Sequence, residues 1–410
     1  MKTKRLKGNI INKILIALIL LVLISTLILT LAYFQDKKEY SGTLDFGNIK
    51  LKVSGGVNSE TSTLVFDTAR KKNNDSTWTG KYMPGDMVDL NLTVGLENNS
   101  EPAYYIISIT DDNEVFESAY YYSDGTKTGD TLNVYVFDRA KTYKQSDTTK
   151  TELTGSDLKN VGKLSAGDTN AQNLTISAKI DENFEEQGIK TTVYCKIFAI
   201  QQANLSETDA RAEIMGNIVG LDTSKYRYVN YLESTGEQWI DTGYVYKTDP
   251  KIEMAINPTQ TKDMFICGNR GRNTPFVFNP DVSNSNAIVN YIYGEESWKQ
   301  MPSTSMKLGK WIKISFGKAY KENGTLIKSI AETYDFSTNT LSIYLFHANG
   351  GGTAYISTVK MGFCRIFDGS SLVRNYVPCL RSSDNKPGMF DTVNNVFYVN
   401  QATGADFLWG

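Results

Sequence analysis

The chain has 410 residues, which is enough for two domains of ordinary size that each bury their own core. Its formal charge is −2, and it has no basic cluster behind the N-terminus, so the sequence gives no reason to expect nucleic-acid binding. The 24 Tyr, 18 Phe and 32 Gly residues favour strands joined by tight turns.

The first predicted element is the apolar run Ile14–Phe34, which carries no charge and follows five basic residues. Such a run is long enough to cross a bilayer, because a helix satisfies its own backbone hydrogen bonds. The basic flank predicts that everything after Phe34 faces outward. Thr30 and Ala32 also match a signal-peptide cleavage site, so two interpretations compete. Either residues 1–32 are removed by a cut between Ala32 and Tyr33, which we favour, or the run 14–34 is retained as a membrane anchor.

Short alternating strands follow from Tyr40 onward. Met87–Val94 places four apolar side chains on one face and three polar ones on the other, the pattern of a half-buried strand. Leu132–Phe137, Leu174–Ile180 and Val193–Ile200 alternate in the same way. Turn-forming clusters separate these segments, so residues 33–203 are predicted to form an antiparallel β-sandwich.

The alternation stops at Gln201, where helix signals begin. Ser206 has an acid, Asp209, three residues later, and the good helix formers Ala210–Met215 follow. We expect a short helix that ends near Gly216 or Gly220, within a connecting segment at 204–225.

Strands resume from Tyr226 and continue to the end of the chain. Lys251–Ile256, Trp311–Phe316 and Leu341–Phe346 alternate, and Tyr355–Phe367 and Val396–Asn400 complete the set. The predicted fold is therefore all-β, with two antiparallel sandwiches of the jelly-roll type after an N-terminal hydrophobic helix. The second sandwich would span 226–410.

The first half resembles the TasA/camelysin family of exported bacterial matrix proteins. The motifs that carry the resemblance occur in order: Ala32–Asp36, Phe46–Ile49, Met83–Asp86, Val94–Asn98 and Ile197–Gln201. The resemblance implies a jelly-roll sandwich over about 33–204 and processing by a dedicated signal peptidase.

The same resemblance implies fibres in which the N-terminal strand of one subunit completes the sheet of its neighbour. The donated strand would be Ser41–Val53, since an open sheet edge accepts a strand through main-chain hydrogen bonds. The alternative is that this segment pairs within its own domain. The family has also been labelled a metallopeptidase, but a chain with the single histidine His347 and no HExxH helix gives no support to a metal site.

The second half resembles a concanavalin A-like, laminin-G-type sandwich. Its motifs are Tyr231–Gly243, Leu372–Cys379 and Gly388–Tyr398. Proteins of this type bind glycans or other proteins, or serve as spacers, so the resemblance does not fix a ligand. A structural calcium ion is compatible with the fold, although no Asp-x-Asp-x-Asp loop indicates one and we expect no cofactor.

Glycan binding requires an exposed aromatic plane beside amide or guanidinium groups, because sugars present apolar CH faces ringed by hydroxyls. The loop 268–273 supplies Arg270 and Arg272, and the loop 291–298 supplies Tyr293 and Trp298. These four residues are the candidate glycan site, and the alternative is an ordinary polar rim. Trp239 and Trp311 lie inside fold motifs and are predicted to be core residues.

Other reactive side chains have simpler interpretations. Cys364 and Cys379 would form a disulfide if neighbouring strands held them close, and otherwise all four cysteines are buried apolar side chains. The adjacent acids at 181–186 and at 295–296 are expected on a solvated surface, and no catalytic group is assigned. His347 is expected to be packed.

These observations favour a non-enzymatic protein, exported to the surface or surroundings of a bacterium, with roles in adhesion or matrix. Its C-terminal sandwich would present a binding surface for a glycan or a protein. Two alternatives stay open: a structural biofilm-fibre subunit without ligand binding, and a glycoside-active enzyme.

Overall fold

The computed structural model describes residues 35–39, 42–44, 49, 51–54, 57–58, 63–64, 67–68, 85–111, 119–137, 141–165, 171–180, 193–203, 205–271, 274–283, 287–350 and 357–410. The apolar run Ile14–Phe34 and the cleavage site at Ala32 and Tyr33 lie outside these residues, as do Arg272 and the acids at 181–186. None of the helices in the described part is long and apolar enough to cross a membrane.

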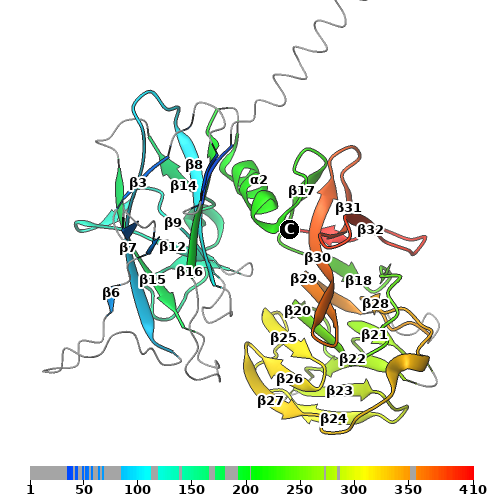
Figure 1. Cartoon of the computed structure of the whole chain (residues 1–410). Coiled ribbons are helices and arrows are strands. Elements are labelled where there is room, and N and C mark those ends of the chain that lie inside the picture. The colour runs from blue at the N-terminus through cyan, green and yellow to red at the C-terminus, as the bar shows by residue number, and fades with distance from the viewer. Residues whose placement is uncertain are drawn as a thin grey trace, which may run out of the picture.

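Strands dominate the described chain, in two groups of sheets joined by one α-helix (Figure 1). The pairings between named strands are antiparallel throughout the described residues, and an isolated parallel bridge joins Asn269 to Asn349. We call the strands before the helix the first unit and those after it the second unit.

The first unit contains an eight-stranded and a four-stranded sheet. The order in the larger sheet is β13 (Thr142–Lys144), β12 (Tyr135–Phe137), β9 (Ala119–Tyr122), β8 (Ala103–Asp111), β16 (Val193–Gln201), β1 (Gln35–Glu39) and β2 (Gly42–Leu44), with β14 (Gly162–Leu164) beside β8. The smaller sheet contains β15 (Gln172–Lys179), β7 (Met87–Leu96) and β3 (Leu51–Ser54), with β6 (Asp67–Thr68) on β7. Short hairpins β4 (Val57–Asn58) with β5 (Thr63–Leu64) and β10 (Lys127–Thr128) with β11 (Thr131–Leu132), and the 3-10 turn η1 (Gly155–Asp157), complete it.

One apolar core lies between these two sheets. Leu90 and Leu92 of β7 belong to the same buried cluster as Ile107 of β8 and Ile197 of β16. The strand β7 follows the predicted alternation, with every second residue from Val88 to Val94 buried. The two inward faces therefore provide the apolar surface that holds the first unit together.

The segment considered for strand donation pairs within its own chain. β2 pairs with β1, which itself lies against β16, and β3 pairs with β7 with Leu51 opposite Leu96. Of the two interpretations of Ser41–Val53, pairing within its own unit is the one that the described strands display.

The helix α2 (Glu207–Val219) connects the two units and begins as the sequence predicts. The Ser206 hydroxyl accepts a hydrogen bond from the Asp209 amide at 3.1 Å, and Gly220 ends the helix with a φ of 82°. Its buried residues Ile214 and Met215 extend the core of the first unit to Val377 of the second. Because α2 packs on both units, it fixes the geometry of the space beneath it.

The second unit contains an eleven-stranded and a six-stranded sheet. The larger sheet runs β27 (Thr325–Ser329), β26 (Ala319–Glu322), β25 (Ile312–Phe316), β20 (Pro250–Pro258), β29 (Thr358–Asp368), β30 (Ser371–Arg381), β31 (Lys386–Asp391) and β32 (Val396–Val399), extended by β17 (Tyr226–Tyr228), β18 (Leu232–Thr235) and β33 (Leu408–Trp409). The smaller sheet runs β19 (Ile240–Asp241), β28 (Tyr344–Leu345), β21 (Cys267–Asn269), β22 (Phe276–Asp281), β23 (Ile288–Tyr293) and β24 (Lys299–Pro302), and the 3-10 turn η3 (Phe336–Thr338) lies between β27 and β28.

An aromatic core joins the two sheets of the second unit. The ring of Phe316, from the larger sheet, lies 4.9 Å from that of Phe276 and 5.2 Å from that of Phe278, both from the smaller sheet. All three side chains are completely buried. The two sheets therefore pack face to face, and each keeps one outer face.

The disulfide proposed for Cys364 and Cys379 is absent, and both are buried free thiols. Cys364 lies directly opposite Tyr376 on the neighbouring strand and shares its core. Cys379 is three residues further along β30, and alternation turns it to the other side of the sheet, toward α2. The two sulfur atoms thus face different cores, and the interpretation as buried apolar side chains is confirmed.

Candidate functional site

The outer face of the six-stranded sheet brings two of the four candidate residues, Trp298 and Arg270, together. Alternation along β22 and β23 turns Phe278 and Tyr291 into the core and Val277 and Ile292 outward. The register places Ile292 opposite Val277, Val277 opposite Gly268, and Gly268 opposite Tyr344. We call this outer surface the Trp298 face.

Trp298 and Arg270 meet at one end of this face, as the sequence predicts for a glycan site. The Arg270 guanidinium lies 5.5 Å from the centre of the Trp298 ring, within the range of a cation–π contact. The edge of the indole approaches Phe265, with ring centres 6.0 Å apart. Trp298 is still 42% exposed, so much of the indole is open to solvent.

Beneath the indole is a small apolar cluster, separate from the main core, formed by Phe265, Val277, Ile292 and Ala348. All four are buried, which supplies a rigid base for the exposed ring. Gly268 is required in this surface, because its φ is 137° and a Cβ atom there would lie 2.0 Å from the Phe276 carbonyl oxygen.

Side-chain amides form a second row beside this cluster. Gln300 of β24 lies opposite Asn290 of β23, which lies opposite Asn279 of β22. The Gln300 amide donates to Asn290 Oδ1 at 2.9 Å. Asn279 is only 7% exposed, and its Oδ1 has no hydrogen-bond partner. Sequence reasoning missed this row, although Asn and Gln at alternate strand positions could have indicated it.

A second pair of aromatic rings occupies the opposite end of the face. Trp239 stacks on Tyr344 with ring centres 4.5 Å apart and planes inclined by 23°. Trp239 is half-buried, so its prediction as a core residue is wrong. Burial raises the pKa of Tyr344, and the nearby Asp241 charge adds to this effect, so the phenol stays neutral.

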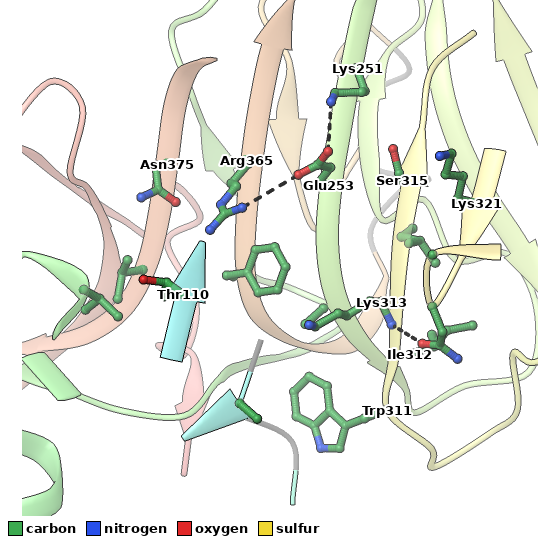
Figure 2. A pocket seen from close by; sticks show the side chains of 18 of the residues that line it. Thr110, Lys251, Glu253, Trp311, Ile312, Lys313, Ser315, Lys321, Arg365 and Asn375 are labelled. Atoms are coloured by element: carbon green, nitrogen blue, oxygen red, sulfur yellow. Dashed lines mark hydrogen bonds and ion pairs between the residues drawn. The ribbon is translucent and has the colours of Figure 1, made fainter. Parts of the chain in front are cut away.

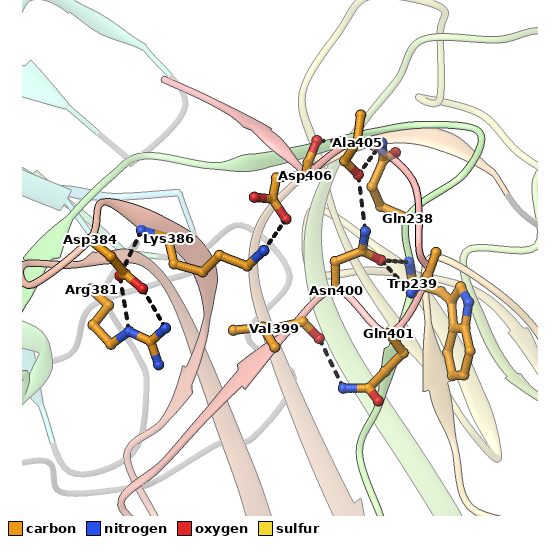
Figure 3. A network of polar contacts seen from close by, with 11 residues as sticks. Gln238, Trp239, Arg381, Asp384, Lys386, Val399, Asn400, Gln401, Ala405 and Asp406 are labelled. Carbon is orange, nitrogen blue, oxygen red and sulfur yellow. Dashed lines mark hydrogen bonds and ion pairs between the residues drawn. The ribbon is translucent and has the colours of Figure 1, made fainter.

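A polar network fixes the backbone around Trp239 (Figure 3). The Trp239 amide donates to Asn400 Oδ1 at 3.2 Å, and its carbonyl accepts from the Gln401 amide at 2.9 Å. The amides of Asn400 and the buried Gln238 both donate to the Ala405 carbonyl at 3.0 Å. These contacts hold the Trp239–Tyr344 pair in one position.

His347 lies against this aromatic pair and is 6% exposed, as expected for a packed residue. Its ring centre is 5.9 Å from those of Trp239 and Tyr344, and its Nδ1 is 2.7 Å from the Ala348 carbonyl oxygen. The preceding Phe346 has a φ of 63°, which interrupts the alternation. The predicted strand Leu341–Phe346 is shorter in the structure, where β28 covers only Tyr344–Leu345, and the positive φ of Phe346 accounts for its end at Leu345.

Tyr293 does not belong to the exposed site, and that prediction is wrong. It is 1% exposed and packs edge-on against Phe276 and Phe336 in the core. Burial raises the pKa of its phenol. The alternation that turns Ile292 outward turns Tyr293 inward, which the loop assignment of 291–298 overlooked.

One carboxylate near the face, that of Glu295, is engaged in an ion pair. Glu295 lies 2.7 Å from Lys299, whose hydrogen bond holds the pKa of that carboxyl below its usual range.

Trp311, predicted as core, is half-buried and packs beside Tyr231 on the opposite side of the second unit. Within the described residues, no group of three or more His, Cys, Asp or Glu side chains could hold a metal ion.

The Trp298 face thus combines a large exposed aromatic plane, a guanidinium and a row of amides on a rigid sheet. An aromatic plane packs against an apolar surface, while amides and a guanidinium donate and accept hydrogen bonds at its rim. A ring with apolar faces and peripheral hydroxyl groups would satisfy both parts of this surface.

No protein-family model matches the chain, and neither does any curated protein. Among solved structures, a galectin from Caenorhabditis elegans is 13% identical with a TM-score of 0.24, covering 36% of this chain and 99% of the galectin. A protein from Bacteroides ovatus described as carbohydrate-binding is 11% identical with a TM-score of 0.32, covering 81% and 93%.

Domains LG4-5 of the mouse laminin alpha1 chain are 9% identical with a TM-score of 0.26, covering 67% of this chain and 84% of the laminin fragment. Sialidase structures from Trypanosoma rangeli match with TM-scores of 0.24 and 0.21. Because every one of these TM-scores lies below 0.5, the similarities carry no conclusion about ligand or activity, and the site must be argued from its own geometry.

Proposed function

We propose that this chain is a non-enzymatic surface protein whose Trp298 face binds a glycan. The observation that carries the proposal is the pair formed by Trp298 and Arg270, with a 42% exposed indole and the guanidinium 5.5 Å from its ring centre. The cation restricts the rotation of the indole and leaves a fixed aromatic plane at the rim of the sheet.

The amide row supports the same proposal. Gln300 and Asn290 lie on the same sheet face as the indole, and their amides offer hydrogen-bond donors and acceptors to ligand hydroxyls. Stacking on Trp298 would provide most of the affinity, and the amides would select the orientation of the hydroxyls.

The sequence supports a bacterial cell-surface or extracellular location for this activity. The basic flank and the apolar run at 14–34 would export the chain, and a signal peptidase would cut between Ala32 and Tyr33. We further propose a TasA-like jelly roll for the first unit and a concanavalin A-like, laminin-G-type sandwich for the second. In this arrangement, the first unit tethers the binding surface of the second for adhesion.

A glycan array tests the proposal directly. Full-length protein in mild detergent should bind neutral glycans, and Trp298→Ala should lose those signals. Trp409→Ala is the matched control, since Trp409 is 47% exposed but lies on β33, away from the Trp298 face. Absence of hits, or equal loss in both variants, contradicts the proposal. Incubation with β-glucans should release no reducing sugar, and release would favour a glycoside-active enzyme.

A structural fibre subunit is the second candidate, and the position of β1 favours it. β1 follows the proposed cleavage site directly and covers the edge of β16 from Gln35 to Glu39. If β1 left, it would expose an edge that accepts the same strand from a neighbour. Negative-stain microscopy of the cleaved chain should show fibres that disappear when residues 33–53 are deleted. Fibres in neither form contradict this candidate.

A further inference from the structure

A cleft of about 1580 Å³ lies beneath α2, between the larger sheets of the two units (Figure 2). One wall is the outer face of the eleven-stranded sheet, and the other includes β8 and β16 of the first unit. Nine Lys or Arg residues line it against four Asp or Glu residues, although acids outnumber bases in the whole chain. The cleft therefore concentrates positive charge on a protein without a positive net charge.

The floor of the cleft is an ordered row of side chains across five adjacent strands. Lys321 of β26 lies opposite Ser315 of β25, which lies opposite Glu253 of β20. Glu253 lies opposite Arg365 of β29, which lies opposite Asn375 of β30. With neighbouring strands about 4.8 Å apart, this row extends over roughly 19 Å. That length exceeds one sugar ring.

The net charge of this row is positive even when the one carboxylate in it, that of Glu253, is paired with cations. Glu253 lies 2.9 Å from Lys251 and 3.9 Å from Arg365, so one carboxylate is shared by two cations. Lys313 lies two residues before Ser315 on the same face of β25, opposite Ala255, and it also lines the cleft. These side chains are only partly buried, so their charged groups are accessible to a ligand.

The opposite wall adds groups of the same kind. Lys196 of β16 lies opposite Ser108 of β8, and the exposed Thr110 follows on the same strand face. Trp311 and Phe363 contribute apolar surface on the side of the second unit. A ligand in the cleft would meet cations, hydroxyls and aromatic surface from both walls.

We propose that this cleft binds an anionic polysaccharide, an extended glycan that carries carboxylate, sulfate or phosphate groups. Its volume exceeds the roughly 300–1,000 Å³ of ordinary small-molecule sites, which favours a chain of several units. The cations would pair with the acidic groups, while Ser315 and Asn375 would accept or donate hydrogen bonds to sugar hydroxyls.

A nucleic acid fits this pattern less well. A duplex would present closely spaced phosphates to the row and few hydroxyl donors, and the Glu253 carboxylate at its centre would repel them. A polysaccharide whose acidic groups alternate with hydroxyls matches a row in which cations alternate with neutral and acidic side chains.

Binding of the full-length protein to immobilised polygalacturonate, dextran sulfate and uncharged dextran tests the proposal. We expect binding to both anionic polymers but not to dextran, and weakening as salt rises from about 0.05 M to about 0.5 M. The double variant Lys313→Gln/Lys321→Gln should weaken polygalacturonate binding roughly fivefold to tenfold, and Lys313→Arg/Lys321→Arg should retain it.

Lys262→Gln/Lys307→Gln is the matched control, because it removes the same charge from exposed lysines outside the cleft. Its affinity for polygalacturonate should stay within about twofold of the wild type. Equal weakening of the two double variants, no weakening of either, no binding to any anionic polymer, or tighter binding of duplex DNA than of polygalacturonate would each overturn the proposal.

Discussion

The second unit carries two outer faces that share one core but differ in chemistry. On the Trp298 face, the exposed groups are an indole, one guanidinium and side-chain amides. On the opposite face, which forms the floor of the cleft, cations, a shared carboxylate and neutral polar side chains occupy outward positions of five strands. The first arrangement favours contact with an uncharged ring, and the second favours a charged chain.

This difference follows from alternation within the strands of each sheet, which turns one set of side chains into the common core and the other outward. The inward residues of both sheets are large and apolar, so they fix the core and the register. The outward residues are free of that packing requirement, and each face can acquire its own ligand chemistry. A shared core with independent faces leads to specific expectations for variants.

The largest effect is expected from a change in the shared core. Phe316 is completely buried, and its ring contacts Phe276 and Phe278 across the two sheets. Phe316→Ala should destabilise the second unit by about 3–5 kcal/mol and weaken both binding activities together. Thermal unfolding and both binding assays measure this outcome. Loss of one activity with the other intact would contradict a common core.

Gly268→Ala should damage the Trp298 face selectively. The φ of 137° and the 2.0 Å approach of a Cβ atom to the Phe276 carbonyl require β21 to shift. We expect a loss of about 1–3 kcal/mol in the free energy of unfolding and weaker glycan binding, with polygalacturonate binding retained. Unchanged stability would show that β21 accommodates a side chain there. Gly129→Ala, whose φ is also positive, whose Cβ atom would meet open space and whose position does not line the cleft, is the matched control.

Cys379 provides a pH test of the packing under α2. Burial raises the pKa of this thiol from 9.0 to about 12. Because the folded-state pKa lies above the unfolded value, the stabilisation from the buried, protonated thiol is intact below pH 9. It is lost as the pH rises toward 12. Denaturant unfolding at several pH values should show stability falling in this range, and Cys379→Ala should reduce that slope by up to about 1.4 kcal/mol per pH unit. An identical slope in the variant would indicate an exposed thiol.

Arg270 should modulate glycan affinity without affecting the cleft. Removal of its contact with the Trp298 ring in Arg270→Ala should cost about 0.5–1 kcal/mol, or roughly twofold to fivefold in affinity. Arg270→Lys retains the charge, so its affinity for the glycan should lie between those of Arg270→Ala and the wild type. Titration calorimetry with a glycan identified on the array measures the difference. A larger effect on polygalacturonate than on that glycan would contradict separate faces.

An effect of similar size but opposite sign is a gain of affinity in the cleft. Glu253→Gln preserves the size of the side chain but removes the charge shared by Lys251 and Arg365. Polygalacturonate should bind about twofold to fivefold more tightly, because one repulsive carboxylate is lost. Glu237→Gln, whose position does not line the cleft, is the control. Weaker binding in Glu253→Gln would mean that the carboxylate itself contacts the ligand.

Much of the fold could be predicted from the sequence because burial imposes a period of two. The alternation of Met87–Val94 and the cap at Ser206 both correspond to observed elements, β7 and α2. The pairing of Cys364 with Cys379 could not be predicted correctly, because the side of the sheet that each cysteine faces depends on the register of β29 and β30. Register is set by contacts that are distant in the sequence.

The site was predicted only in part, for the same reason. Trp298 and Arg270 do meet, but they come from segments 28 residues apart whose contact depends on β22 lying between β21 and β23. Tyr293 belongs to a strand that continues three residues further than its loop-like composition indicated. The cleft could not be predicted at all, because its two walls belong to different units.

One experiment tests the separation of the two faces most directly: binding of a neutral array glycan and of polygalacturonate by Trp298→Ala and by Lys313→Gln/Lys321→Gln, with all four combinations measured together. We predict that Trp298→Ala loses the neutral glycan and retains polygalacturonate. The double lysine variant should retain the neutral glycan and bind polygalacturonate roughly fivefold to tenfold more weakly. If either variant loses both ligands while its thermal unfolding is unchanged, the two faces do not act as separate sites, and the account is wrong.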